Sequence, residues 1–205
     1  MRLLVLGATG KTGIELVEQG LERGFAITAL ARSPQKIPIR NERLEVVAGN
    51  LLEEEMLART LPGKDAVLST LGHTDLKPSS FVTEAARTLV EAMPRHGVAR
   101  LLIVSSTLVA PGGSFLTKIP RIITRHALND SARMEELVRR APLDWTIVRL
   151  ARLTNGAQSA YRTFEDEPPS VSVSISRKTV AACMLDLITD RAYVRKITGV
   201  SREAP

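Results

Sequence analysis

The stretch LLVLGATGKTG at residues 3–13 sets the expectation for the fold. Its first four residues form a continuous apolar run, which is typical of a strand buried on both faces of a sheet. Glycines follow at positions 7, 10 and 13, and apolar residues then recur at helical spacing at 14, 17 and 21. This order predicts a buried strand, a tight turn and an amphipathic helix, which together open a sheet covered by helices.

The glycine turn is typical of a phosphate-binding site. Glycines let the backbone turn tightly and approach a pyrophosphate, while the free N–H groups and the dipole of the following helix stabilise the anion. The alternative is a strand–helix turn that binds nothing, and the spacing is not that of a Walker A loop. The candidate cofactor residues are Gly7, Thr9, Gly10, Lys11, Thr12 and Gly13.

Along the rest of the chain, apolar bursts alternate with amphipathic stretches. We expect strands at 27–31, 44–48, 66–71, 101–104 and 145–150, and helices near 53–61, 82–93, 122–140 and 176–188. This alternation predicts an α/β, Rossmann-like, doubly wound fold, with a mostly parallel sheet and helices on both faces. The polar segment 154–169 is expected to be a loop, followed by short strands at 171–175 and 193–197. Residues 1–205 are expected to form a single domain, with substrate-pocket loops at about 107–120 and 151–169.

Composition narrows the class of protein. The chain has 205 residues, a formal net charge of +6 and 44% hydrophobic residues, as expected of a globular domain. A single cysteine excludes an intrachain disulfide and a CxxC metal site, and no metal-ligand spacing occurs elsewhere. The apolar runs are too short to cross a bilayer and the first residues do not resemble a signal peptide. We therefore expect a cytoplasmic protein without a membrane partner.

The excess of positive charge raises the question of a nucleic-acid partner. Aromatic residues make up only 3% of the chain, which is few for a protein that stacks on bases. Basic residues recur within 121–140, but acidic residues interrupt them, and no helix-turn-helix, RRM or zinc motif is present. We expect no nucleic-acid partner and assign part of the charge to a phosphate-bearing cofactor.

The end of the second predicted strand distinguishes NADP from NAD. An NAD site places Asp or Glu there to bind the ribose 2′-hydroxyl, whereas this chain has Ala31-Arg32-Ser33. A guanidinium beside a hydroxyl suits a 2′-phosphate, and Lys36 and Arg40 follow nearby. Arg32 and Ser33 therefore indicate NADP(H), unless Arg32 is an ordinary surface arginine.

Two further strand ends are expected to contact the cofactor, because ligands of such sheets bind outside the carboxyl ends of the strands. Asn50 and Leu51 follow the third strand, and Asn50 either hydrogen-bonds an adenine edge or caps the next helix. Leu71, Gly72 and His73 follow the fourth. His73 can donate a proton, but a solvated loop histidine is the simpler interpretation.

Five segments together resemble the atypical short-chain dehydrogenases/reductases. They are GATGKTG at 7–13, ARS at 31–33, GNL at 49–51, VSST at 104–107 and LDWTIVR at 143–149. The resemblance spans nearly the whole chain and is closest to the NmrA-like NAD(P)-binding group that includes the biliverdin-IXβ reductases, also called flavin reductases. It implies one Rossmann domain that is usually monomeric, with a weak dimer left open. It also implies NADPH as donor and a planar acceptor such as a flavin, a linear tetrapyrrole or a quinone.

The resemblance assigns the cofactor to the positions named above, and Ser106 matches the serine near the nicotinamide ring. The departures from the family concern the acceptor pocket. Two histidines that flank this pocket in the flavin reductases are replaced here by Ser131 and Arg152, which become the candidate substrate residues. Asn50 stands where Asp is common, and Leu150 replaces a frequent proline. These departures leave NADP(H) as the expected cofactor.

The expected chemistry is hydride transfer without a catalytic tyrosine. Neither Tyr161 nor Tyr193 is followed by Lys four residues later, as the classical short-chain mechanism requires. Transfer to a delocalised planar acceptor needs mainly that two rings are held face to face. Ser106 would then orient the nicotinamide, and Arg152 would pair with acidic groups of the acceptor. The alternative is an NADP-binding redox sensor that regulates a partner without turnover.

Overall fold

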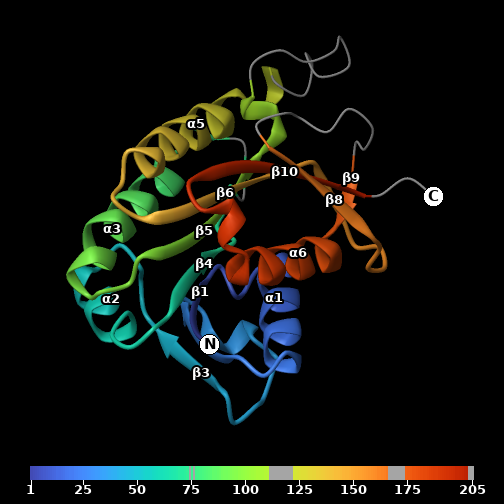
Figure 1. The fold of residues 1–205 in the computed structure, drawn as a ribbon. Coiled ribbons are helices and arrows are strands. Elements are labelled where there is room, and N and C mark those ends of the chain that lie inside the picture. The colour runs from blue at the N-terminus through green and yellow to red at the C-terminus, as the bar shows by residue number, and fades with distance from the viewer. Residues whose placement is uncertain (74, 76, 111–121, 166–173, 203–205) are drawn as a thin grey trace.

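A computed structural model describes residues 1–73, 75, 77–110, 122–165 and 174–202 (Figure 1). Its main sheet has the strand order β3-β2-β1-β4-β5-β6-β10-β8, and β7 pairs with β9 in a second, two-stranded sheet. Within the main sheet every neighbouring pair is parallel except β10 and β8. The strands are β1 (Arg2–Leu6), β2 (Ala26–Ala31), β3 (Leu44–Ala48), β4 (Ala66–Ser69), β5 (Arg100–Ser106), β6 (Asp144–Leu150), β7 (Arg152–Thr154), β8 (Tyr161–Glu165), β9 (Ser174–Ser176) and β10 (Lys196–Arg202).

Helices cover both faces of this sheet. Helices α1 and α6 pack against each other on one face, while α2, α3 and α5 lie on the other (Figure 1). The helices are α1 (Lys11–Glu22), α2 (Glu54–Thr60), α3 (Phe81–Arg95), α5 (Arg125–Arg139) and α6 (Arg177–Thr189), with short 3-10 turns η1 (Pro34–Lys36), η2 (Thr107–Val109) and η3 (Arg191–Tyr193). The structure thus confirms the predicted Rossmann-like, doubly wound α/β fold.

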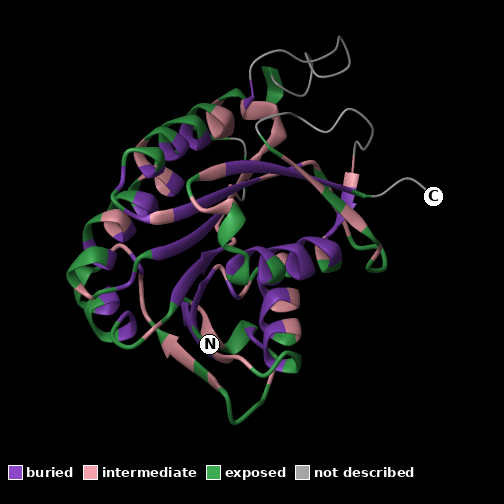
Figure 2. Cartoon of the chain, in the orientation of Figure 1, coloured by how far each residue is buried: buried purple, intermediate pink, exposed green. Residues whose placement is uncertain are grey.

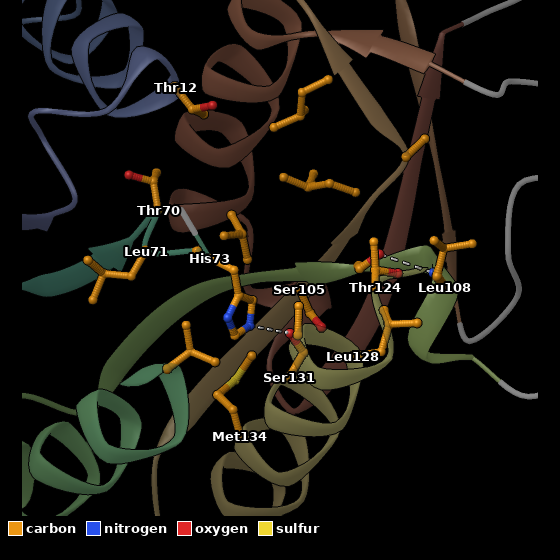
Figure 3. Close-up of a pocket in the computed structure, with 18 residues that line it drawn as sticks. Thr12, Thr70, Leu71, His73, Ser105, Leu108, Thr124, Leu128, Ser131 and Met134 are labelled. Atoms are coloured by element: carbon orange, nitrogen blue, oxygen red, sulfur yellow. Dashed lines mark hydrogen bonds between the residues drawn. The ribbon is translucent and has the colours of Figure 1, made fainter. Parts of the chain in front are cut away.

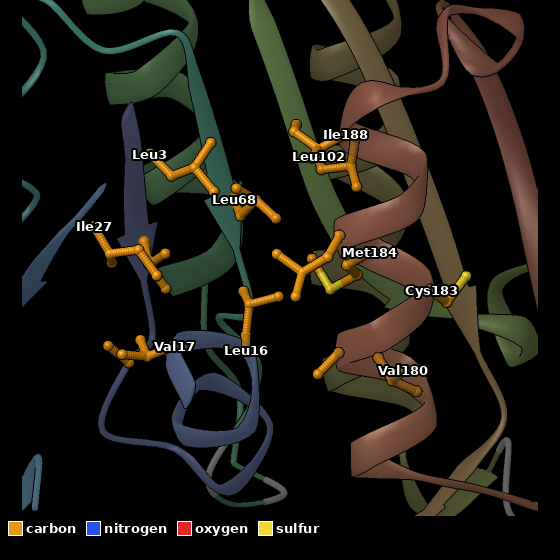
Figure 4. Packing of buried hydrophobic residues seen from close by; sticks show 14 of the residues in the cluster. Leu3, Leu16, Val17, Ile27, Leu68, Leu102, Val180, Cys183, Met184 and Ile188 are labelled. Atoms are coloured by element: carbon orange, nitrogen blue, oxygen red, sulfur yellow. The ribbon is translucent and has the colours of Figure 1, made fainter. Parts of the chain in front are cut away.

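The alternation of β1 explains why its apolar run is continuous. Successive side chains of a strand point to opposite faces of the sheet. Leu3 and Val5 belong to the core under α1 and α6, which contains Leu16 and Met184, whereas Leu4 and Leu6 belong to the core under the other helices. Figure 4 shows the core under α1 and α6. In Figure 2 the purple of buried residues runs along the central strands. A strand buried on both faces needs an apolar residue at every position.

The order of the strands defines where a ligand can enter. The chain runs from β1 to β2 and β3 on one side and then crosses to β4, β5 and β6 on the other. Such a reversal leaves a crevice at the carboxyl ends of the two central strands, here β1 and β4, because their crossover helices leave in opposite directions. The glycine turn after β1 lies at this crevice.

The C-terminal quarter differs from the sequence-based expectation. The predicted loop 154–169 contains β8, which is antiparallel to β10 at one edge of the sheet. Its sequence, YRTFE, reads as polar because an edge strand exposes one side to solvent, and none of its residues is fully buried. The last strand, predicted at 193–197, runs from Lys196 to Arg202. Of the strand predicted at 171–175, residues 171–173 lie outside the described part of the chain.

Candidate functional site

The turn between β1 and α1 depends on two of its glycines. Gly7 has a φ of +80°, a left-handed conformation that favours glycine, and its carbonyl oxygen accepts a hydrogen bond from Gly10 N–H at 2.9 Å. A Cβ atom at Gly13 would lie 2.1 Å from that same carbonyl oxygen, so α1 can begin this close to the turn only with glycine there. The turn is therefore compact, and its glycines leave the backbone open to close approach, as a pyrophosphate site requires.

The first turn of α1 offers backbone donors to an anion. The first N–H groups of a helix have no partner within the helix, and the N-cap residue here, Gly10, has no side chain to accept them. No acidic residue occupies the first turn, and Lys11 is exposed there. Thr9 and Thr12 are half-buried beside it. The helix dipole, the free donors and Lys11 all favour negative charge at this point.

Arg32 lies at the far end of the crevice, directly after β2. Its side chain is exposed, and the guanidinium carbon stands 5.6 Å from the centroid of the Phe81 ring at the start of α3. Among the described residues the guanidinium makes no ion pair, so its donors are available to a ligand. Ser33 is the N-cap of η1 but its hydroxyl makes no capping hydrogen bond, which leaves this group available as well.

The ends of β3 and β4 supply the other predicted cofactor residues. Asn50 does not cap α2, because the N-cap of this helix is Glu53. The side-chain oxygen of Asn50 instead accepts a hydrogen bond from Leu52 N–H at 3.3 Å. Leu51 is buried in the core. Gly72 is exposed, and no atom lies within 4 Å of the place where its Cβ would be, so the backbone there faces open space.

A cavity of about 310 Å³ opens beside the glycine turn, at the carboxyl ends of β4, β5 and β6 (Figure 3). Helices α3 and α5 contribute Val82 and Met134 to its wall. Residues that the sequence assigned to the cofactor and to the substrate meet here, since the cavity is lined by Thr12, Leu71, Gly72, His73, Ser106 and Ser131. Residues 111–120 of one predicted pocket loop and 166–169 of the other lie outside the described ranges.

Two serines at the end of β5 face this cavity. The hydroxyl of Ser106 accepts a hydrogen bond from Leu108 N–H at 3.2 Å and so begins the η2 turn, while the residue also lines the cavity. The hydroxyl oxygen of Ser105 is buried and has no hydrogen-bond partner among the described residues. A buried polar atom without a partner is unusual in a native structure, so Ser105 has donor and acceptor capacity left for a ligand.

His73 is not the solvated loop histidine of the simpler interpretation. Only 15% of its side chain is exposed, and its Nε2 atom lies 3.4 Å from the hydroxyl of Ser131 and 3.9 Å from a carboxylate oxygen of Asp130. Figure 3 shows the ring of His73, from the loop after β4, next to the hydroxyl of Ser131, from α5. The structure therefore places a histidine in the cavity wall.

Arg152 is not brought into the cavity. It is exposed at the start of β7, whereas its neighbours Ala151 and Leu153 line the cavity. The nearby Arg149 of β6 forms a buried ion pair with Glu135, with N–O distances of 2.6 and 3.0 Å. Neither arginine is thus among the described groups that line the cavity.

Sequence reasoning missed Asp130, although a signal for it was present. On α5, Asp130, Ser131, Met134 and Val138 follow helical spacing and are all buried. An acidic residue on the buried face of an amphipathic helix must find donors. Asp130 finds them at the start of α3, where its carboxylate accepts hydrogen bonds from Val82 N–H and Thr83 N–H, each at 3.2 Å.

The described residues contain neither a metal-binding cluster nor a membrane-spanning helix. No group of three His, Cys, Asp or Glu side chains there could hold a metal ion. Within the same ranges, no helix has the length and apolar character that crossing a membrane would require.

Proteins of known sequence resemble this chain over most of its length. An uncharacterized chloroplastic protein of Arabidopsis thaliana is 30% identical over 222 residues, which cover 100% of this chain and 78% of that protein. The photosystem II assembly factor Ycf39 of Synechocystis is 27% identical over 210 residues, which cover 94% of this chain and 61% of its own length. The chain thus spans less than two thirds of the Synechocystis relative.

Solved structures and a family model agree with the fold. A short-chain dehydrogenase/reductase of Veillonella parvula in complex with NADP has a TM-score of 0.86 at 20% identity, covering 99% of this chain and 95% of that one. A provisionally named NADH-flavin reductase of Streptococcus pneumoniae has a TM-score of 0.80 at 19% identity, covering 99% and 100%. A family model described as NAD(P)H-binding matches residues 7–191. The glycine turn, the open helix end beside it and this match over most of the chain together show that the protein belongs to the NAD(P)H-binding family.

Proposed function

We propose that this protein is an NADPH-dependent oxidoreductase that transfers a hydride to a planar, conjugated acceptor. The observation that carries the proposal is the junction of an anion site and a cavity. Thr12 belongs to both, because it stands in the first turn of α1 and also lines the cavity. A dinucleotide with its pyrophosphate at the helix end can therefore reach the cavity with its nicotinamide ring.

The preference for NADPH rests on the end of β2. The exposed guanidinium of Arg32 and the hydroxyl of Ser33 supply donors there, and Lys36 and Arg40 are exposed close by in the sequence. No carboxylate directly follows β2, where an NAD site would bind the ribose 2′-hydroxyl. A 2′-phosphate would form charge-assisted hydrogen bonds with the guanidinium, which are about twice as strong as neutral ones.

The cavity suits a flat, largely apolar acceptor. Leucine, valine, alanine and methionine side chains make up most of its described wall, and a volume of about 310 Å³ lies at the lower end of the range for small-molecule sites. Ser106 is placed to orient a nicotinamide carboxamide, and Ser131 stands across the cavity on α5. When bound, NADPH would supply the hydride, and these residues would hold the two rings face to face.

The test is oxidation of NADPH by the purified protein with FMN, menadione and biliverdin as separate acceptors. We expect turnover well above the rate in buffer with at least one of them, faster with NADPH than with NADH. Gly10→Val serves as the control, because its side chain would occupy the pyrophosphate position and should reduce turnover to background. Tight NADPH binding without turnover on any acceptor would contradict the proposal and favour a redox sensor.

A further inference from the structure

His73 is the one titratable side chain among the described residues that line the cavity. The polar residues around it are serines and threonines, and the remainder of the described wall is apolar. No lysine or arginine of the described ranges lines the cavity. Among the described residues of the wall, His73 is therefore the candidate proton donor.

The surroundings of His73 fix its ring. Nε2 lies 3.4 Å from Ser131 Oγ and 3.9 Å from Asp130 Oδ2, and both partners come from the buried face of α5. The Asp130 carboxylate is itself fully buried and held by Val82 N–H, Thr83 N–H and the Thr83 hydroxyl. A carboxylate with so many donors has one orientation, and it lies near the same ring nitrogen as the Ser131 hydroxyl.

We propose that His73 supplies the proton for acceptor reduction, through the hydroxyl of Ser131. The proposal rests on the proposed reductase function and names a catalytic group within it. The acceptor gains a hydride with the electron pair of the C4–H bond of the dihydronicotinamide ring, which becomes NADP⁺. The displaced π-electron pair moves to a carbonyl oxygen of the acceptor, which takes the proton of the Ser131 hydroxyl. The Ser131 oxygen takes the proton of the His73 imidazolium in turn, and solvent later reprotonates the imidazole.

The charge balance of the cavity explains why a proton source is needed. A hydride adds negative charge to the acceptor, and an unpaired charge in an apolar cavity is costly. With no lysine or arginine in the described wall, protonation by His73 is the way to remove this charge. The need differs between acceptors: a carbonyl oxygen of a quinone concentrates the charge on one atom, whereas a reduced flavin spreads it over its rings. We therefore assign the site to conjugated carbonyl acceptors, of which a quinone is the simplest.

The charged groups around His73 also bear on the pH dependence. Asp130 on α5 is the nearest, and the side of α3 that lines the cavity contributes Val82, which is uncharged. Further charged groups are the Glu135–Arg149 ion pair between α5 and β6, and Asp75 and Lys77 of the histidine's own loop, which are exposed. Since an acid must be protonated to act, we expect the wild-type kcat for a quinone to fall as the pH rises.

The experiment compares His73→Gln and Ser131→Ala with the wild type, using NADPH with menadione and, separately, with FMN. General acid catalysis contributes roughly 100-fold or more, so we expect both variants to lower kcat for menadione by about that factor. FMN is the comparison acceptor: because its reduction does not require this proton in the same step, the ratio of kcat for menadione to kcat for FMN should fall in both variants. The Kd for NADPH, measured alongside, separates this loss from weaker cofactor binding. His96→Gln, at the far end of α3, is the matched control and should behave as the wild type.

The pH profile separates catalysis from structure. The decline of kcat with pH should disappear in His73→Gln and persist in His96→Gln. Unchanged kcat and an unchanged pH profile in His73→Gln, or turnover of FMN with none of menadione in the wild type, would overturn this inference and leave the reductase function standing. No wild-type turnover on any acceptor would overturn both. If His73→Gln fails to fold by circular dichroism, Ser131→Ala decides, since it removes the relay and keeps the histidine.

Discussion

At the scale of a single residue, the proposed preference for NADPH depends on the guanidinium of Arg32. Arg32→Glu would remove two or more charge-assisted donors and place a carboxylate near the 2′-position. We expect the Kd for NADPH to rise by about 10- to 100-fold, since hydrogen bonds to charged groups contribute about 1.5–3 kcal/mol. The Kd for NADH should change little or improve, because a carboxylate can accept from the ribose 2′-hydroxyl. Nicotinamide fluorescence titration measures both constants.

A charge-matched variant separates a local contact from a general effect of charge. Arg87→Glu makes the same substitution on the exposed side of α3, away from β2, and should leave both constants as in the wild type. Equal weakening of NADPH and NADH by Arg32→Glu would show that the arginine does not contact the 2′-phosphate.

Cys183 is a second residue whose environment sets its chemistry. It is fully buried on α6 (Figure 4), and desolvation by burial raises the pKa of its thiol to about 12. The thiolate is the reactive form, so a shift of about three pKa units lowers the reactive fraction about 1000-fold relative to a free cysteine. Iodoacetamide at pH 8 should therefore not modify the folded protein within an hour, whereas it should do so in urea. Mass spectrometry measures the extent of alkylation over time, and rapid alkylation of the folded protein would contradict this prediction.

At the scale of elements, one ion pair ties α5 to β6. Glu135 and Arg149 form two short contacts, with only 5% and 14% of their side chains exposed. Removing one partner leaves a buried charge uncompensated, which costs about 3–5 kcal/mol. We expect Glu135→Leu and Arg149→Met each to lower the free energy of unfolding by about that amount. Equilibrium urea unfolding measures this loss.

The double variant tests whether the cost is the lost partner or the lost contact. Glu135→Leu with Arg149→Met leaves no orphan charge and should recover most of the stability, because apolar replacements of a buried pair are often close to neutral. A double variant that is less stable than either single variant would mean that the pair contributes packing that methionine and leucine do not restore.

Predictability from sequence also differs between elements. The six strands with apolar bursts were predicted at or near their observed bounds, because burial on two faces leaves a continuous hydrophobic run. Strand β8 was not predicted, since its position at the sheet edge requires only partial burial and its pairing partner, β10, lies more than thirty residues away. Strand β8 forms because it pairs with β10, and the local composition of residues 161–165 does not indicate this pairing.

For the whole molecule, the cofactor half of the site was easier to predict than the acceptor half. The glycine turn is contiguous in sequence, so the glycine spacing together with the preceding strand and the following helix indicated it. The contact of His73 with Ser131 joins residues 58 positions apart. It depends on α5 packing against α3 and on Asp130 binding the start of α3. Single-sequence patterns place both helices but not their contact, and so they suggested a solvated histidine at a position that the fold encloses.

Because segments distant in sequence meet at the crevice, cofactor binding should also affect the stability of the whole chain. The crevice is built from the ends of strands on both sides of β1, so a ligand that bridges them binds the folded state alone. At an NADPH concentration 100 times its Kd, binding adds about 2.7 kcal/mol to the free energy of unfolding. This corresponds to a rise of about 5–10 °C in Tm for a chain of this size.

Gly10→Val should abolish this rise, because its side chain occupies the anion site. The fold should survive, because a Cβ at Gly10 meets only the Gly7 carbonyl oxygen, at 3.2 Å. Ala58→Val adds similar bulk at an exposed position of α2 and should keep the full rise. Scanning calorimetry with and without NADPH measures these shifts, and an undiminished rise in Gly10→Val would place the pyrophosphate elsewhere.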